Sequence, residues 1–265
     1  MSPAKYANPN ELTVCRSFWE RLYAEQSSKY KKDKDIIKAA KRRLHQAYGA
    51  FYKKDNIKAA KALLERCEDP QRLSEQLLGL CISSGERAGF VAEFYEFIFG
   101  AIPREKIKKI ETIMDLGCGL NPFAFPFVEG ADKNIQIKAY YAYDIGVELI
   151  FLANRYFALL GLPQCAECMD LIAELPTKAV DLVFMFKVFP ILENCKKGRG
   201  FEILENLNFT YAAVSFPTKT LCGKDINMEK NYAAFFEGGL RRDKFELLGK
   251  KTFANELVYV LEKKQ

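Results

Sequence analysis

The sequence has no long apolar run and very little histidine. No window of eighteen residues is uninterruptedly apolar, so no transmembrane helix is expected. The opening residues, MSPAKYANPN, lack the basic segment and apolar run of a secretory signal, so we expect a cytoplasmic protein. Internal repeats and low-complexity tracts are also absent. Apolar residues make up 49% and charged residues 28%, which excludes disordered and collagen-like classes and is typical of a globular protein.

The scarcity of histidine bears on how the cysteines are interpreted. Cys165 and Cys168 form a C-x-x-C pair, a pattern found in zinc and redox sites. A structural zinc site needs four ligands, and the single histidine, His45, is far away in the sequence, so we expect no metal. No thioredoxin-like pattern surrounds the pair. We therefore expect free thiols at all eight positions, which are Cys15, Cys67, Cys81, Cys118, Cys165, Cys168, Cys195 and Cys222.

The net charge of +6 is unevenly distributed along the chain. Residues 1–110 carry 22 basic and 14 acidic side chains, whereas residues 111–265 carry 18 and 20. The most basic part is 29–66, with 13 basic and 4 acidic side chains. A basic module beside a near-neutral one favours a surface that docks on a polyanion. The alternative is a solvated helical face without a partner.

The first hundred residues have a helical pattern. One predicted helix has an apolar stripe at about 100° per residue, formed by Ile36, Ile37, Ala40, Leu44, Ala47, Tyr48 and Phe51. Its opposite face carries the candidate RNA-binding residues Lys34, Lys38, Lys41, Arg42 and His45. A second helix is predicted to begin at the capping box of Ser83 and Glu86 and to stop at Gly100 and Pro103.

From residue 110 onwards, short β-rich runs alternate with helical stretches. The runs are IETIMD, IKAYYAYD, VDLVFMFKV, FTYAAVSFP, KFELLGKK and NELVYVLE. Helices are expected near 146–160, 190–206 and 229–239. This alternation predicts a parallel sheet covered on both faces. The last two runs are separated by a short connection and predict a closing antiparallel pair.

The first of these strands leads into a possible ligand site. Asp115 ends the strand, and Gly117 and Gly119 follow in a tight turn that lets the backbone approach a ligand. The third glycine of the dinucleotide-binding fingerprint is missing. Asp144 ends the second strand, where a carboxylate can bridge two ribose hydroxyls. The set resembles motif I and the ribose acid of the S-adenosylmethionine (SAM)-dependent methyltransferases; a plain strand-to-helix turn is the alternative.

A narrower resemblance covers the chain from about residue 30 to its end. The sequence is similar to the aminoglycoside-resistance 16S rRNA methyltransferases that modify N7 of guanosine 1405. The matching segments are RRLHQAYGAFY (42–52), SSGER (83–87), DLGCGLNP (115–122), MFKVFPILE (185–193), SFPTKTLCGKDINMEKNYAAFFEGGL (215–240) and NELVYVLEKK (255–264). The segment that begins SFPTK is the most specific to this family.

The resemblance implies a set of cofactor-binding residues. Arg87 would hold the carboxylate of SAM, a role that suits a guanidinium; a surface arginine is the alternative. Gly117, with the neighbouring backbone, would line the methionine part, and Asp144 would bind the ribose. Asp170 and Leu171 would contact the adenine, with Asp170 accepting from the amino group. For Asp170, a helix N-cap before LIAEL is a close alternative.

The CAECM run before Asp170 is counted as the third strand, and the target base is expected to lie at the ends of the fourth and fifth strands, VDLVFMFKV and FTYAAVSFP. N7 of guanine already presents a lone pair, so the reaction needs no general base; the enzyme unstacks the base, aligns N7 and excludes water. Cations could bond guanine O6 or a phosphate, and aromatic rings could stack on the base. The candidates are Lys187, Phe216, Pro217, Lys219, Met228 and Tyr232. Phe216 and Tyr232 could equally be core residues, and Lys187 an exposed strand end.

The chain departs from the family pattern at several positions. Cys81 stands where family members commonly have His, and Phe51 where they have Tyr, although Tyr52 is adjacent. SSGER replaces S-T-x-E-R, and Asn227–Met228 replaces a Gly-Met pair. These changes concern contacts to the cofactor and the target and leave the reaction class unchanged.

The expectation is therefore an α/β protein with a class I SAM-dependent methyltransferase, Rossmann-like sheet and an N-terminal helical domain. Residues 1–104 would form the basic RNA-docking domain and residues 105–265 the SAM-binding domain. The expected partner is the 30S ribosomal subunit through its 16S rRNA, with the protein acting as a monomer. Two alternatives remain: a SAM-dependent methyltransferase of a small molecule or protein, and a non-catalytic RNA-binding protein. The basic module at 29–66 favours the rRNA methyltransferase over the first alternative. The intact set of Asp115, Gly117, Gly119 and Asp144 favours it over the second.

Overall fold

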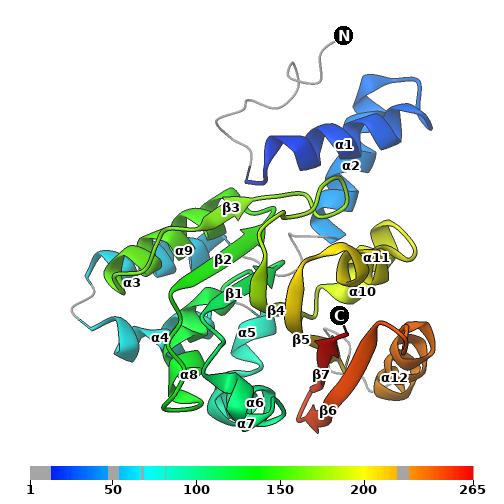
Figure 1. Cartoon of the computed structure of the whole chain (residues 1–265). Coiled ribbons are helices and arrows are strands. Elements are labelled where there is room, and N and C mark those ends of the chain that lie inside the picture. Colours follow the sequence, from blue (N-terminus) through cyan, green and yellow to red (C-terminus); the bar gives the residue numbers. More distant parts are fainter. Residues whose placement is uncertain (1–12, 47–53, 67–68, 81, 220–226, 265) are drawn as a thin grey trace.

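The computed structural model describes residues 13–46, 54–66, 69–80, 82–219 and 227–264 (Figure 1). Within these ranges, seven strands form one sheet in the order β3–β2–β1–β4–β5–β7–β6. The strands are β1 (Thr112–Leu116), β2 (Ala139–Asp144), β3 (Ala166–Cys168), β4 (Val180–Phe186), β5 (Phe209–Pro217), β6 (Phe245–Phe253) and β7 (Glu256–Lys263). The first five strands pair in parallel, and β7 pairs antiparallel with β5 and β6. The predicted parallel sheet with a closing antiparallel pair is confirmed.

The helices lie on both faces of this sheet. In the described ranges they are α1 (Arg16–Ser27), α2 (Asp33–Leu44), α3 (Lys54–Glu65), α4 (Pro70–Leu78), α5 (Ile82–Gly85), α6 (Val91–Gly100), α7 (Arg104–Ile107), α8 (Phe125–Gly130), α9 (Val147–Leu159), α10 (Phe189–Cys195), α11 (Arg199–Asn206) and α12 (Met228–Gly239). Two short 3-10 helices, η4 (Ala88–Phe90) and η5 (Asn121–Ala124), complete them.

Two hydrophobic cores lie on the opposite faces of the sheet because successive strand residues point to opposite sides. Ile113 belongs to the core that contains α9 and α6, whereas Met114 belongs to the core that contains α10, α11 and α12. Both faces are therefore covered, which explains why β4, with the sequence VDLVFMF, is almost continuously apolar.

The N-terminal helices share the first of these cores. Trp19, Ala60, Leu77 and Phe94 come from α1, α3, α4 and α6, and all four lie in one buried cluster with residues of the sheet. Figure 1 shows α1 and α2 together beyond the β3 side of the sheet, with α12 and β6 at the other side. The division of the chain at residue 104 stays a prediction, since one core extends across it.

Two of the predicted helices are interrupted. The helix predicted from Ser83 to Gly100 is divided into α5, η4 and α6. Gly85 and Gly89 weaken the helix on either side of Arg87, whose side chain is buried. The helix expected near 190–206 is α10 and α11, separated at Gly198, which has φ +82. Glu193 supports that turn by accepting from the backbone N–H groups of Gly198 and Gly200.

The predicted amphipathic helix in the basic part corresponds to α2. Ile36 and Ala40 are buried, whereas Lys34, Lys38, Lys41, Arg42 and His45 are exposed, as the periodicity predicts. The end of the predicted apolar stripe, at Ala47, Tyr48 and Phe51, lies outside the described residues.

Asp181 provides a test of how the sheet is held at its amino edge. Its Oδ2 accepts from Glu111 N at 2.9 Å, Thr112 N at 2.9 Å and Thr112 Oγ1 at 2.7 Å. Asp181→Ala leaves these donors without their acceptor, so the free energy of unfolding should fall by about 1–3 kcal/mol in urea denaturation. The control is Asp243→Ala, which removes an exposed ion pair with Arg241 and should change it by about 0–1 kcal/mol. Equal midpoints for both variants would contradict the prediction.

Candidate active site

Four of the predicted cofactor residues, Arg87, Asp115, Gly117 and Gly119, meet at the carboxyl edge of β1, whereas Asp144, at the end of β2, and Asp170 and Leu171, after β3, do not line the same cleft. A cleft there is lined by Ser84, Arg87, Asp115, Gly117, Cys118, Gly119, Leu120, Asn121 and Phe186. Open α/β sheets bind their ligands at this edge. The cleft brings the SSGER segment beside the D-x-G-x-G turn, although the two are about thirty residues apart in the sequence.

The turn after β1 needs both of its glycines. Gly117 has φ +64 and Gly119 has φ +53, a conformation that L side chains rarely adopt. A Cβ at Gly117 would also lie 2.5 Å from Val188 Cγ2, which is below any ordinary contact distance. The turn is fixed to the next strand by a hydrogen bond of 3.0 Å from Cys118 N to Tyr143 O. The backbone therefore passes close to the cleft without a side chain to fill it.

Asp115 is a buried carboxylate held by neutral groups. Its Oδ2 accepts from Tyr140 OH at 2.7 Å and from Asn121 Nδ2 at 2.9 Å. No cationic side chain of the described ranges forms an ion pair with it. Burial raises the pKa of Asp115 to about 6, against the hydrogen bonds of Asn121 and Tyr140, which favour the ionised form. The charge of Arg87 also favours the ionised form, and a cationic ligand in the cleft would add to this effect.

Asp144 supports the glycine turn from the end of β2. Its Oδ2 accepts from Gly119 N at 3.0 Å, and its Oδ1 accepts from Gly146 N at 2.8 Å. Burial raises the pKa of Asp144, and these backbone hydrogen bonds oppose the shift. An ionised carboxylate offers about four acceptor positions, so the backbone bonds from Gly119, Ile145 and Gly146 leave acceptor capacity for a ligand hydroxyl.

Arg87 is buried, so the alternative that it is a surface arginine is wrong. Its Nε and Nη2 donate to Glu256 at 3.2 and 2.6 Å, and its Nη1 donates to Asn121 Oδ1 at 2.8 Å. The rings of Phe94 and Phe186 lie 4.2 and 4.7 Å from the guanidinium carbon. A guanidinium has five N–H donors, and these bonds use three of them. Two donors are left for a carboxylate in the cleft.

Glu256, at the start of β7, is the residue that the sequence reasoning missed. It is fully buried and accepts from Ser215 Oγ at 2.5 Å as well as from Arg87, with Lys187 Nζ at 3.6 Å. Burial opposes its ionisation, but Arg87 and Lys187 outweigh that effect and lower the pKa of Glu256. The available signal was a lone acid at the head of the apolar run LVYVL, which could only be placed once β7 was known to lie beside β5.

Asp170, which the sequence suggests as the adenine-binding acid, is also paired with a cationic side chain that the sequence did not reveal. It is buried and forms an ion pair with Arg21 of α1 at 2.5 Å, and its Oδ1 accepts from Ile172 N at 3.1 Å. The alternative that Asp170 caps a helix is wrong, because residues 171–173 form a turn and no helix begins there. Leu171 is buried beside it.

The candidates for holding the target base have unequal environments. Phe216 is fully buried among Phe189, Phe236 and Tyr259, so its ring belongs to the core and has no face for a base. Tyr232 is half-buried and stacks on Phe216 with ring centroids 5.3 Å apart. Met228, at the first position of α12, is half-buried, and Lys219 is exposed just beyond β5.

Lys187 is not an exposed strand end. It follows β4 with φ +56, and its side chain is 10% exposed. Its Nζ donates to Glu86 at 2.8 Å, and its backbone N–H donates to Ser215. The positive φ turns the chain sharply at the sheet edge and places the ammonium between Glu86 and Glu256. Lys187 and Arg87 therefore share the same buried acid, Glu256.

Several positions from the family comparison lie outside the described structure. These are Cys81, Phe51 and Tyr52, together with residues 220–226 of the SFPTK segment. Cys165 and Cys168 are half-buried free thiols.

Among the described residues, no helix is long and apolar enough to span a bilayer.

Comparison with known proteins identifies the chain. Residues 4–260 match the ribosomal RNA methyltransferase (FmrO) family. The chain belongs to this family. It is 34% identical to a 16S rRNA (guanine(1405)-N(7))-methyltransferase of Serratia marcescens, over 97% of this chain and 95% of that protein. A relative of the same name from Micromonospora echinospora is 31% identical over 86% of the chain and 83% of that protein.

Solved structures agree with this assignment. The 16S rRNA methyltransferase RmtF, in complex with S-adenosyl-L-homocysteine, superposes with a TM-score of 0.82 at 31% identity, covering 98% of this chain and 95% of that one. The 16S rRNA methylase RmtB superposes with a TM-score of 0.78 at 30% identity, covering 95% and 92%. The predicted class I methyltransferase fold and the predicted family are thereby confirmed for this rRNA methyltransferase.

The pKa of Asp115 leads to a prediction about ligand binding by this rRNA methyltransferase. The ionised carboxylate attracts a ligand ammonium and the protonated form does not, so affinity for S-adenosylhomocysteine should rise as the pH rises through about 6. Between pH 5 and pH 7 the gain should be about tenfold. Calorimetry over this range measures it, and Asp115→Asn should flatten the profile. A wild-type affinity independent of pH would contradict the role of Asp115.

Proposed function

We propose that the protein transfers the methyl group of S-adenosylmethionine to N7 of guanosine 1405 in helix 44 of 16S rRNA. The substrate is the 30S subunit, and the modified ribosome resists aminoglycosides. The observation that carries the proposal is family membership over residues 4–260, with relatives named for this reaction. The cleft supports it, because its donors and acceptors match those of the cofactor.

The groups of the cofactor match polar side chains that line the cleft or lie at the neighbouring strand ends. The two spare N–H donors of Arg87 suit the carboxylate of the methionine part, and the unpaired Asp115 suits its ammonium. Asp144 keeps acceptor positions for the ribose hydroxyls, and Asp170 keeps one for the adenine amino group. When bound, SAM supplies an electrophilic methyl group on its sulfonium. The chain's own part is to fix that group in place and to exclude water.

The target base is held on the same edge of the sheet, beyond β4 and β5. Lys219 follows the end of β5, and Met228 and Tyr232 lie in the first two turns of α12, which packs against β5 through Tyr232 and Phe216. The ammonium of Lys219 bonds the base or its phosphate, while Tyr232 and Met228 border the base. Lys187 does not contact the base directly, because Glu86 and Glu256 hold its ammonium. Phe216 supports Tyr232 from beneath.

The helical N-terminal part docks on the rRNA. The exposed face of α2 carries Lys34, Lys38, Lys41, Arg42 and His45. This face has no acidic residue of α2 beyond its first turn, where Asp33 and Asp35 lie. Neutralisation of phosphates by such a face releases counterions, so docking depends on salt. That the protein acts as a monomer stays a prediction.

Mapping of 16S rRNA tests the proposed function. Ribosomal RNA from cells that express the protein should show cleavage at guanosine 1405 after borohydride and aniline treatment, and the cells should resist aminoglycosides. The control is Asp115→Asn, which should give neither result. A protein that binds S-adenosylhomocysteine but methylates another nucleotide, or none, would contradict the assignment.

A charge-reversal variant tests the docking surface. Replacing Lys38, Lys41 and Arg42 together by Glu should weaken 30S binding at least tenfold and make it less dependent on salt, because phosphate contacts are lost. Affinity for S-adenosylhomocysteine should stay unchanged. The matched control reverses Lys108, Lys109 and Lys133. These residues are exposed in the segments that precede the amino ends of β1 and β2. Equal effects of both triple variants in filter binding would show that only net charge matters.

Lys219 tests the chemistry separately from docking. Lys219→Ala should slow single-turnover methylation of purified 30S subunits by about 100-fold, since misplacing the reacting atoms by about 1 Å has that effect. Binding of the 30S subunit and of S-adenosylhomocysteine should change less than about twofold. Lys230→Ala, on the exposed side of α12, is the control. A Lys219→Ala rate within about twofold of wild type would remove Lys219 from the site.

A further inference from the structure

An arginine of the first helix contacts the proposed adenine-binding carboxylate. Nε of Arg21 donates to Asp170 Oδ2 at 2.5 Å, and Nη2 donates to Oδ1 at 3.3 Å. The side chain of Asp170 is 1% exposed and that of Arg21 is 17% exposed. The two residues are far apart in the sequence, and Arg21 belongs to no recognised motif. A cation from the helical N-terminal part therefore lies at the adenine end of the proposed cofactor site.

The helix that carries Arg21 is itself fixed to the ribose end of the site. Cys15 N donates to Ile145 O at 2.7 Å, and Val147 N donates to Thr13 O at 3.1 Å, so the chain before α1 pairs with the turn after Asp144. Arg21 lies six residues beyond Cys15, a rise of about 9 Å along a helix. The segment thus connects the turn of Asp144 with Asp170 and sets their separation.

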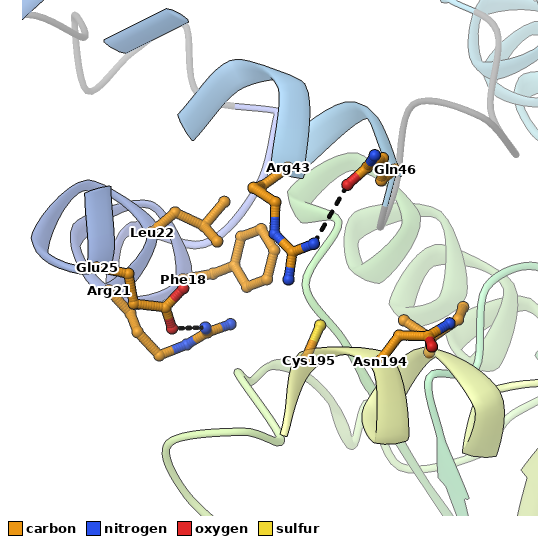
Figure 2. Close-up of a pocket in the computed structure, with 9 residues that line it drawn as sticks. Phe18, Arg21, Leu22, Glu25, Arg43, Gln46, Asn194 and Cys195 are labelled. Carbon is orange, nitrogen blue, oxygen red and sulfur yellow. Dashed lines mark hydrogen bonds and ion pairs between the residues drawn. The ribbon is translucent and has the colours of Figure 1, made fainter. Parts of the chain in front are cut away.

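Local contacts hold the guanidinium of Arg21 in one orientation. Nη1 donates to Glu25 Oε1 at 2.5 Å, one turn further along α1, and the ring of Phe18 lies 5.2 Å from the guanidinium carbon. Figure 2 shows Arg21 beside Glu25 and Phe18 on one wall of a cavity of about 420 Å³, with Asn194 and Cys195 of α10 on the other. With both neighbours on its own helix, Arg21 presents its Nε and Nη2 side to Asp170.

The hydrogen bonds of Asp170 leave room for one more donor. Within the part of the chain that the structure describes, Oδ1 accepts from Arg21 Nη2 and from Ile172 N, whereas Oδ2 accepts only from Arg21 Nε. Each carboxylate oxygen has two lone pairs, so one acceptor position remains, on Oδ2. An adenine amino group can use it, whereas the carbonyl oxygen of a hypoxanthine would face an anion.

We propose that Arg21 is a positioning residue for adenosine recognition, which rests on the adenine role proposed for Asp170. The two-point contact of the guanidinium holds the carboxylate in one orientation, so that its remaining lone pair meets the adenine amino group. The preference for adenine over hypoxanthine therefore depends on a side chain of α1. Because α1 packs against the basic helix α2, the RNA-docking part of the chain also forms part of the cofactor site.

Binding measurements on the whole protein test this role. Arg21→Met keeps the length of the side chain and removes its charge. Affinity for S-adenosylhomocysteine should fall about tenfold by calorimetry. The preference over S-inosylhomocysteine, in which a carbonyl replaces the amino group, should fall by a similar factor. Arg21→Lys restores the charge without the two-point contact and should recover part of both. Combined with Asp170→Asn, Arg21→Met should cause no further loss.

The matched control is Arg16→Met on the same helix. The side chain of Arg16 is 65% exposed and pairs with Glu20 at 2.7 Å, so its loss should leave both affinities within about twofold of wild type. Unchanged base preference in Arg21→Met would overturn the proposal. Tighter binding of S-adenosylhomocysteine would also overturn it, because Arg21 would then compete with adenine.

The remaining outcomes also discriminate. If Arg21→Met does not fold, as judged by circular dichroism, Arg21→Lys carries the test, and wild-type affinity and base preference in that variant would overturn the proposal. A wild-type protein that does not bind S-adenosylhomocysteine would contradict the proposed function, whereas binding that is indifferent to residue 21 contradicts only the role of Arg21.

Discussion

The buried ion pair between Arg87 and Glu256 is the interaction on which the site depends. Both side chains are almost completely enclosed, and the pair joins the segment before α6 to the first residue of β7. Removing one partner of such a pair leaves a buried charge without compensation, a loss of about 3–5 kcal/mol in comparable cases. Glu256 also accepts from Ser215, and Lys187 lies near it. The pair therefore sets the direction of Arg87 and the position of Lys187 together.

The three acids of the proposed cofactor site are held in three different ways. Asp115 has neutral partners, Asp144 has backbone N–H groups, and Asp170 has a guanidinium. Each arrangement suits a different ligand group. An acid without a cation attracts an ammonium, whereas an acid already paired with a cation retains only directional acceptor capacity for a neutral amino group. In the proposed site, the different partners of these acids distinguish the methionine end of the ligand from its adenosine end.

The helical N-terminal part contributes to two surfaces at once. The outer face of α2 is cationic and open to solvent, while α1, which packs against α2, reaches the adenine end of the proposed cofactor site through Arg21. Movement of these helices on a docked rRNA would change the environment of Asp170. On the target side, the ring cluster around Phe216 gives Tyr232 a fixed support. Phe216, which the sequence suggests as a stacking residue, is therefore a core residue that packs against Tyr232.

The sequence by itself determined the features that depend on local order. Periodicity predicted the parallel strands, the closing pair and the two faces of α2, and the D-x-G-x-G turn with Asp144 located the cleft, because glycine conformations and strand ends are encoded by neighbouring residues. Only the tertiary structure decided which charges meet. Glu256 pairs with Arg87 across 169 positions of sequence, and Arg21 pairs with Asp170 across 149. Phe216 likewise proved to be core only once the helices beside it were placed. Pairing over such distances depends on strand order and helix packing, which no local pattern specifies.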